Sequence, residues 1–158
     1  MGKSVSPASD REYKVYRIEN GIVIDHVVHW GAYKVIEILG LRGQDSLVTV
    51  GFGLTSDKMG KKDLLKVENL NLTQEDINRI AIVAPTATIN RVEGARIVDK
   101  FTVRLPDRFE GLIRCANPAC ITRHEPVPPR FLTLARSPVV LRCHYCTHVS
   151  QGDEIEVL

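Results

Sequence analysis

The chain has 158 residues, 44% of them hydrophobic and 25% charged, which is close to the average for globular proteins. This composition excludes a disordered or fibrous protein, and a net charge of only +2 is far from that of a strongly basic nucleic-acid binder. The longest apolar run, residues 80–84, is much shorter than the roughly 20 residues of a membrane helix, so we expect no membrane partner. The polar start of the chain lacks the apolar core of a secretory signal, which favours a cytoplasmic location.

The part of the chain before residue 104 alternates strand-like and helix-like patterns. Stretches at 13–18 and 22–28 flank an Asn20-Gly21 turn, which predicts a hairpin-like entry. Apolar residues at helical spacing then predict an amphipathic helix over 31–41. Two further strands are expected near 46–54 and 62–69.

A second helix is predicted after residue 73. Thr73 is placed to cap it, with Asp76 at the third helical position in a capping box and Leu72 positioned to pack on Ile77. Pro85 follows its end. Its apolar face repeats at helical spacing and consists of Ile77, Ile80, Ala81 and Ala84.

Segments 87–92 and 95–103 predict one more pair of strands, which gives the order β-β-α-β-β-α-β-β. Two helices on one face of a mostly antiparallel sheet is the natural packing of such a chain, so we predict an α+β fold of ferredoxin-like type. The composition changes near 103–107, because eight lysines precede this point and none follows, while seven arginines lie from Arg104 onward. We therefore expect a tail at 1–12, a first domain at 13–103 and a second at 104–158.

All four cysteines lie in the second domain: Cys115, Cys120, Cys143 and Cys146. The pattern C-x4-C, then 22 residues, then C-x2-C places two thiolates on each of two turns, enough to surround one Zn²⁺ at about 2.3 Å. Two disulfides are the alternative, but they are uncommon in the reducing compartment that we expect here. His144 and His148 lie beside the last pair and could replace a thiolate, yet four sulfurs already complete the shell. The predicted zinc, one per chain, is structural because no coordination position stays open.

The second domain has few apolar residues beyond short stretches at 131–134 and 139–141. Prolines punctuate it, and we predict a small all-β domain. Structural zinc contributes on the order of 10 to 16 kcal/mol in small peptides, far more than such a core supplies. Metal binding would therefore drive the folding of this domain.

Several charged residues of the first domain lie on predicted strands. Lys62 and Lys66 share one face of a strand about 13 Å apart, and Asp25, His26 and Lys100 lie on other strands. These side chains would meet around an anion if their strands are neighbours, and the simpler alternative is a solvated face. No Walker loop, dinucleotide fingerprint or nucleophile elbow occurs, so nothing in the sequence demands catalysis.

Four strings of the sequence resemble the regulatory chain of aspartate carbamoyltransferase. They are GIVIDH (Gly21 to His26), TVGFGLTSDKMGKKDLLKVEN (Thr49 to Asn69), APTATINRV (Ala84 to Val92), and CANPACITRHEPV followed by CHYC. The strings occur in the family's order, both cysteine pairs have its spacing, and the similarity runs from about Tyr13 to the end. The resemblance implies an allosteric domain that binds nucleoside triphosphates, a zinc domain that contacts the catalytic chain, and no activity of its own.

The resemblance also implies which residues form the effector pocket. Phosphates and ribose would be held by Asp25, His26, Lys62, Lys66 and Lys100. The base would lie among Asn90, Val15, Ile18, Val23, Val92 and Ile97. Arg17 and Ala95 depart from the family's residues near the base. A triphosphate carries several negative charges, so ammonium groups suit it, and the Asp25 carboxylate suits ribose hydroxyls.

By the same resemblance, two catalytic trimers would be bridged by three regulatory homodimers in pyrimidine biosynthesis. CTP would favour the low-activity arrangement and ATP the active one, with UTP as a further candidate. Two alternatives come from other classes: a zinc-ribbon protein that binds nucleic acid, and a stand-alone nucleotide sensor. Against the first, residues 104–150 offer only Phe109, Phe131 and Tyr145 for base stacking, so we expect no nucleic-acid partner.

Overall fold

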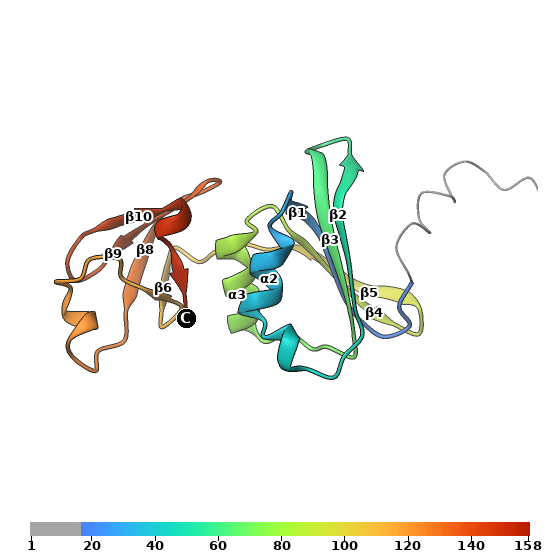
Figure 1. The fold of residues 1–158 in the computed structure, drawn as a ribbon, viewed down its shortest axis with the longest axis horizontal. Helices are drawn as coiled ribbons and strands as arrows, with labels where there is room; N and C mark the ends of the chain where they lie inside the picture. Colours follow the sequence, from blue (N-terminus) through green and yellow to red (C-terminus); the bar gives the residue numbers. More distant parts are fainter. Residues whose placement is uncertain (1–16) are drawn as a thin grey trace, which may run out of the picture.

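A five-stranded sheet forms the larger of two lobes in the computed structural model, which describes residues 17–158 (Figure 1). The strand order is β2-β3-β1-β4-β5, and every neighbouring pair is antiparallel. The strands are β1 (Gly21–Val28), β2 (Val48–Ser56), β3 (Gly60–Glu68), β4 (Thr88–Glu93) and β5 (Arg96–Thr102).

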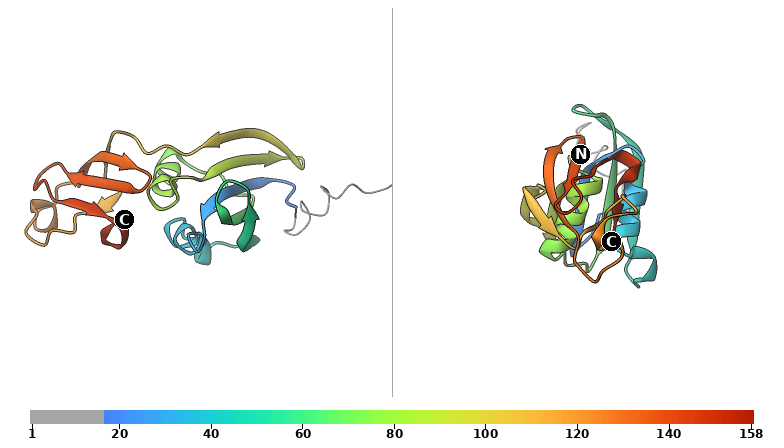
Figure 2. Two further views of the ribbon diagram at one scale, coloured as in Figure 1. Left: turned by 90° about the horizontal axis from the view of Figure 1, so that it is seen from above. Right: turned by 90° about the vertical axis from the view of Figure 1, so that its left-hand side faces the viewer.

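Two helices, α2 (Ala32–Ile38) and α3 (Gln74–Val83), lie side by side on one face of this sheet (Figures 1 and 2). From β1 to β4 the chain therefore runs β-α-β-β-α-β with order β2-β3-β1-β4, and β5 extends the sheet beyond β4. This arrangement confirms the predicted α+β fold of ferredoxin-like type.

The capping box at the start of α3 is present as predicted. The Thr73 hydroxyl accepts from the Asp76 backbone N–H at 3.1 Å, and the Asp76 carboxylate accepts from the Thr73 N–H at 3.0 Å. These two bonds satisfy backbone donors that the first turn of a helix leaves without partners. The helix then buries Ile80 and Ala81 against the sheet.

Two predicted elements differ from the structure. The first helix is shorter than the expected 31–41, because Gly40 adopts a left-handed conformation (φ 60°) and the chain turns into a 3-10 helix, η1 (Leu41–Gly43). Of the strand expected at 13–18, residues 13–16 lie outside the described residues, and Arg17 and Ile18 precede β1 without being part of a strand.

The smaller lobe is all-β apart from two 3-10 turns, η2 (Ile121–Arg123) and η3 (Gly152–Glu154), which agrees with the prediction. One sheet has the order β10-β9-β8-β6, and β11 pairs with β7. The strands are β6 (Arg108–Glu110), β7 (Ile113–Arg114), β8 (Arg130–Arg136), β9 (Val139–Cys143), β10 (Val149–Gln151) and β11 (Glu156–Val157).

The two lobes lie end to end (Figure 2, left) and are joined by an extended segment after β5. Their buried residues nevertheless form one continuous hydrophobic cluster, which includes Ile80 of α3, Leu105 of the joining segment and Ile113 of β7. Within the described part of the chain, no helix has the length and apolar character needed to span a membrane.

Candidate functional site

A cavity of about 770 Å³ opens on the larger lobe. Its lining residues on β1, β3 and β4 alternate with core residues such as Ile24, Leu65 and Ile89, which pack in the same cluster as the helices. Because successive side chains of a strand point to opposite faces, the cavity lies on the face of the sheet away from α2 and α3. The lining residues are Arg17, Ile18, Val23, Asp25, Gly53, Leu54, Thr55, Asp57, Lys62, Leu64, Lys66, Asn90, Val92, Ala95, Ile97 and Lys100.

One row of side chains crosses this face of the sheet. Val23 on β1 is the register partner of both Lys66 and Asn90, and Asn90 is in turn the partner of Lys100. Neighbouring strands lie about 4.8 Å apart, so the Cα atoms of Lys66 and Lys100 are about 14 Å apart. Two lysines thus flank an amide and an apolar side chain, an arrangement that suits an anionic ligand lying across the sheet.

Lys62 is already paired in this structure. Its Nζ lies 2.8 Å from Asp25 Oδ1 and 3.1 Å from Oδ2, and both side chains are less than one-fifth exposed. The Asp25 carboxylate therefore offsets the charge of Lys62. The other charged residues that line the cavity are three cations, Arg17, Lys66 and Lys100, and one carboxylate, Asp57. The lining therefore keeps a net positive charge.

The environment of Lys66 disfavours its charged form. Partial burial lowers the pKa of Lys66, the positive charge of Arg17 lowers it further, and the Asp25 carboxylate raises it in part. An anion bound beside Lys66 would oppose both lowering effects and restore the charge.

Asn90, which lines the cavity, has a buried polar atom. Its side chain is 7% exposed, and its Oδ1 has no hydrogen-bond partner among residues 17–158. An acceptor left unpaired in this way costs about 1–3 kcal/mol. A ligand that donates a hydrogen bond at this point would remove that cost.

The structure does not bring every predicted pocket residue into the cavity. Nine of the eleven line it, Val15 lies outside the described residues, and His26 is not among the lining residues. His26 lies at a β-bulge, where the pairing of β1 with β3 shifts between Ile24 and Val27, and its φ is 57°. Such a bulge breaks the alternation of side chains, so His26 does not follow Val23 and Asp25 into the lining, although its ring Nδ1 still lies 3.7 Å from Asp25 Oδ2.

The hairpin of β2 and β3 supplies lining residues that the sequence did not reveal: Gly53, Leu54, Thr55, Asp57 and Leu64. The pairing of β2 with β3 shifts between Gly51 and Leu54. The carboxylate of Asp63, which is fully buried, holds this bulge by accepting from the Gly53 N–H at 3.1 Å. In the sequence, only one feature hints at this bulge. It is a carboxylate, Asp63, next to the apolar residues Leu64 and Leu65 of β3.

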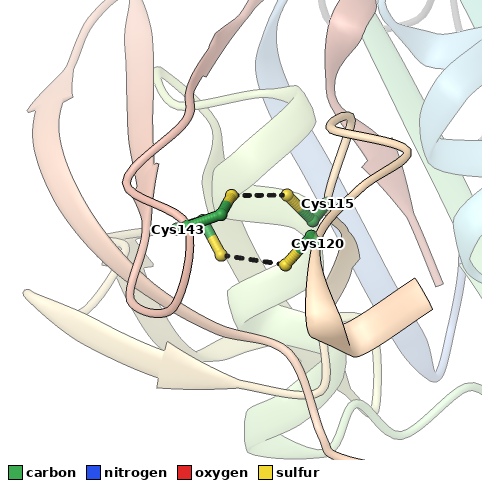
Figure 3. Close-up of side chains that lie close together, drawn as sticks. Cys115, Cys120 and Cys143 are labelled. Carbon is green, nitrogen blue, oxygen red and sulfur yellow. Dashed lines mark hydrogen bonds between the residues drawn. The ribbon is translucent and has the colours of Figure 1, made fainter. Parts of the chain in front are cut away.

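The four cysteines form a compact cluster in the smaller lobe. Figure 3 shows Cys115 and Cys120 on one side and Cys143 on the other, with sulfur atoms pointing toward one another. All four sulfur atoms lie within 4.8 Å of one another, with Sγ–Sγ distances of 3.6 Å for Cys115–Cys146 and 3.7 Å for Cys120–Cys143. The cysteines are therefore not joined as disulfides, in which the distance is about 2.05 Å.

The spacing of the sulfurs suits a tetrahedral metal ion. Ligands at about 2.3 Å from a tetrahedral centre lie about 3.8 Å apart, close to the two shortest distances here. Cys115 follows β7, Cys120 begins η2, Cys143 ends β9 and Cys146 lies in the next turn, so rigid elements hold each pair. His148 bonds to Glu154 at 2.9 Å, and His144 packs edge-on against Tyr145, so neither histidine joins the cluster.

The surroundings raise the pKa of two of the cysteine thiols and lower that of the other two. Burial raises the pKa of Cys115 and of Cys143. At Cys146 burial acts in the same direction, but hydrogen bonds from the His148 backbone and the Asn117 side chain outweigh it. The net effect lowers the pKa of Cys146 to about 7. The hydroxyl of Thr122 donates to Cys120 Sγ at 3.2 Å. A bound dication would hold all four as thiolates.

Comparisons with known proteins assign the cavity and the cysteine cluster to two different domains. Residues 13–104 match the family described as "Aspartate carbamoyltransferase regulatory chain, allosteric domain", and residues 107–156 match "Aspartate carbamoyltransferase regulatory chain, metal binding domain". The cavity lies within the first match and the cysteine cluster within the second.

Curated relatives named "Aspartate carbamoyltransferase regulatory chain" match over most of both lengths. The chain is 43% identical to that of Pyrococcus furiosus over 146 residues, covering 91% of this chain and 96% of the relative. It is 45% identical to that of Thermococcus gammatolerans over 145 residues (91% and 96%) and 44% identical to that of Methanothermobacter thermautotrophicus over 146 residues (92% and 94%). The chain therefore belongs to the family of aspartate carbamoyltransferase regulatory chains, the non-catalytic subunits of that enzyme.

Proposed function

We propose that this regulatory chain binds nucleoside triphosphates in the cavity on its larger lobe and thereby regulates a catalytic chain held by its smaller lobe. The observation that carries the proposal is the row of Lys66, Val23, Asn90 and Lys100 across the open face of the sheet. Each lysine ammonium stands at the end of a flexible four-carbon stem, so both reach phosphate oxygens that lie over Val23. The charge balance of the cavity favours an anion.

The remaining lining residues suit the nucleoside. The Asp25 carboxylate accepts hydrogen bonds from ribose hydroxyls, and Lys62, which it now holds, becomes free to move to a phosphate. Apolar side chains of Ile18, Val92 and Ile97 form a wall for the base. Val15 belongs to the proposed pocket by family resemblance alone, and His26 by that resemblance and by its contact with Asp25.

The cysteine cluster holds one structural zinc ion in this proposal. Four sulfurs at tetrahedral spacing are typical of Zn²⁺, and a complete shell leaves no position for a substrate. The metal then supplies the folding energy of the smaller lobe, which docks on the catalytic chain. We accordingly propose that the chain consists of a tail at 1–12, a nucleotide domain at 13–103 and a zinc domain at 104–158.

Regulation would work as a population shift between two arrangements of an assembly in which three regulatory dimers bridge two catalytic trimers. CTP binds better to the low-activity arrangement and ATP to the active one, with UTP as a further effector. Unequal binding that amounts to about 1–3 kcal/mol is sufficient for such coupling. The assembly acts in pyrimidine biosynthesis in the cytoplasm.

The proposed homodimer would form through the surface near β2. Among the described residues, β2 pairs only with β3, and its sequence VTVGFGLTS has neither charge nor proline, whereas the other edge strand, β5, carries charged residues. Beside β2, Trp30 and Tyr33 are 57% and 56% exposed and stack with Phe52 at ring-centroid distances of 5.4 and 4.6 Å. An uncharged edge beside exposed aromatic rings favours association, and a second copy fits it by antiparallel strand pairing.

Calorimetric titration of the zinc-loaded chain with CTP and ATP tests the proposal. Parent protein should bind each nucleotide saturably, and Lys100→Ala should weaken binding by at least about tenfold, since one charge-assisted contact contributes about 1.5–3 kcal/mol. Lys61→Ala is the matched control, because Lys61 is an exposed lysine of β3 that does not line the cavity. Equal affinities for the parent chain and Lys100→Ala, or no saturable binding by the parent, would count against the cavity.

A further inference from the structure

The segment 152–158 is hydrogen-bonded to the strand that directly precedes Cys115 of the cysteine cluster. Its strand β11 pairs antiparallel with β7, and the Leu158 N–H donates to the Leu112 carbonyl at 2.8 Å. Glu154 of the same segment contacts His148, two residues after Cys146. Since Cys115 directly follows β7, a shift of this segment moves residues next to both cysteine pairs.

The same segment is also fixed to the larger lobe. Arg79 of α3 donates from Nε to the Leu158 carbonyl at 3.0 Å. Its guanidinium is held in place by Glu75 and by Asp76, whose Oδ1 lies 3.8 Å from Arg79 Nη1. The Arg79 side chain is 19% exposed and Leu158 is 47% exposed, so the contact lies at the surface but its donor side chain is largely covered.

A second contact between the segment and the larger lobe is weaker. Lys34 of α2 lies 3.7 Å from Asp153, but the two side chains are 57% and fully exposed. Exposed ion pairs of this kind contribute little, because water screens them. Arg79 is therefore the stronger attachment of the two.

The sheet connects α3 to the cavity. Ile80, next to Arg79, is fully buried in the core cluster with Ile24 and Ile89. Ile24 and Ile89 are chain neighbours of Val23 and Asn90, which line the cavity on the opposite face. A ligand that shifts β1 or β4 therefore acts directly on the surface against which α3 packs, because closely packed interiors transmit strain.

We propose that Arg79 is a positioning residue that couples the cavity to the cysteine cluster, through its hydrogen bond to Leu158 and the pairing of β11 with β7. The inference rests on the proposed binding of nucleotides in the cavity. The competing route is covalent, because β5 continues through residues 103–107 into β6. Only the first route passes through the Arg79 side chain.

Hydrogen exchange on the full zinc-loaded chain, with and without saturating CTP, separates the two routes. In the parent, CTP should change the exchange rates of the Leu158 and β7 amides by at least about fivefold, the lower end of ordinary coupling between two sites. Arg79→Gln should reduce this change to less than about twofold while CTP affinity and zinc content stay near the parent values. Lys34→Gln, which alters the exposed contact to the same segment, should respond like the parent.

Three results would overturn the inference. A full response in Arg79→Gln would show that the coupling bypasses the Arg79 side chain, through the 103–107 segment or the apolar cluster that spans both lobes. CTP binding by the parent without any change at β7 and β11 would refute the coupling and leave the proposed function intact. No CTP binding by the parent would refute the proposed function and this inference with it.

Discussion

Replacing Asp63 with Asn should destabilise the larger lobe by about 3–5 kcal/mol. The Asp63 carboxylate is fully buried, accepts from the backbone N–H groups of Gly53 at 3.1 Å and Ala32 at 3.2 Å, and lies 3.2 Å from His29 Nδ1. Hydrogen bonds to a charged group contribute about 1.5–3 kcal/mol each, and an amide offers one oxygen instead of two. At least one donor therefore loses its partner, and the remaining bonds lose the carboxylate charge.

Urea unfolding of the zinc-loaded chain measures this loss. Trp30 is the single tryptophan and lies 4.5 Å from the His29 ring, so its fluorescence reports on the neighbourhood of Asp63. With a dependence on urea of about 1–3 kcal/mol per molar, the midpoint should fall by more than about 1 M. Exposed Asp45→Asn serves as the control and should stay within about 0.5 kcal/mol of the parent. A change of less than about 1 kcal/mol in Asp63→Asn would refute the role of the buried carboxylate.

Two further outcomes follow from the same structure. Cys143→Ser should lose the proposed zinc ion and unfold the smaller lobe, because structural zinc contributes on the order of 10–16 kcal/mol, which exceeds the stability of most small domains. Metal analysis and circular dichroism check this, and a variant that keeps one zinc ion and its fold would contradict it. Burial and Arg17 lower the pKa of Lys66, so the free chain loses the Lys66 proton at a lower pH than an ordinary lysine does. A triphosphate bound as proposed would restore the charge. Nucleotide binding should therefore take up protons, and affinity should fall as the pH rises from about 8 to about 10, near the ordinary lysine value. Calorimetry in buffers of different ionisation enthalpy measures the proton uptake, and a variant Lys66→Gln with the same pH dependence as the parent would exclude Lys66 as its source.

The sheet, the helices and the cysteine cluster were predictable because local signals in the sequence agree with the packing. The capping residues Thr73 and Asp76 define the start of α3, and alternating apolar residues define which face of β3 is buried. The spacing of the cysteines brings their sulfurs together, since each pair lies on one short turn. These signals come from residues close in sequence, although the shortest sulfur contacts join the two pairs, Cys115 to Cys146 and Cys120 to Cys143.

The shape of the cavity was harder to predict, because it depends on irregular pairing between distant strands. Gly53 reaches the cavity through a bulge held by Asp63, ten residues away on another strand. His26 is not a lining residue because it lies at a second bulge, whose left-handed backbone does not follow from the alternation of apolar residues. The contact of Arg79 with Leu158 joins elements 79 residues apart and has no local signal at all.

The most direct test of the account is to reconstitute the zinc-loaded chain with its aspartate carbamoyltransferase catalytic chain and measure carbamoyl transfer with and without CTP. The account predicts that CTP lowers activity only when the regulatory chain is present, and that Lys100→Ala assembles normally but loses most of this response. Assembly with activity that is the same with and without CTP, or an undiminished response in Lys100→Ala, would contradict control of the enzyme from this cavity.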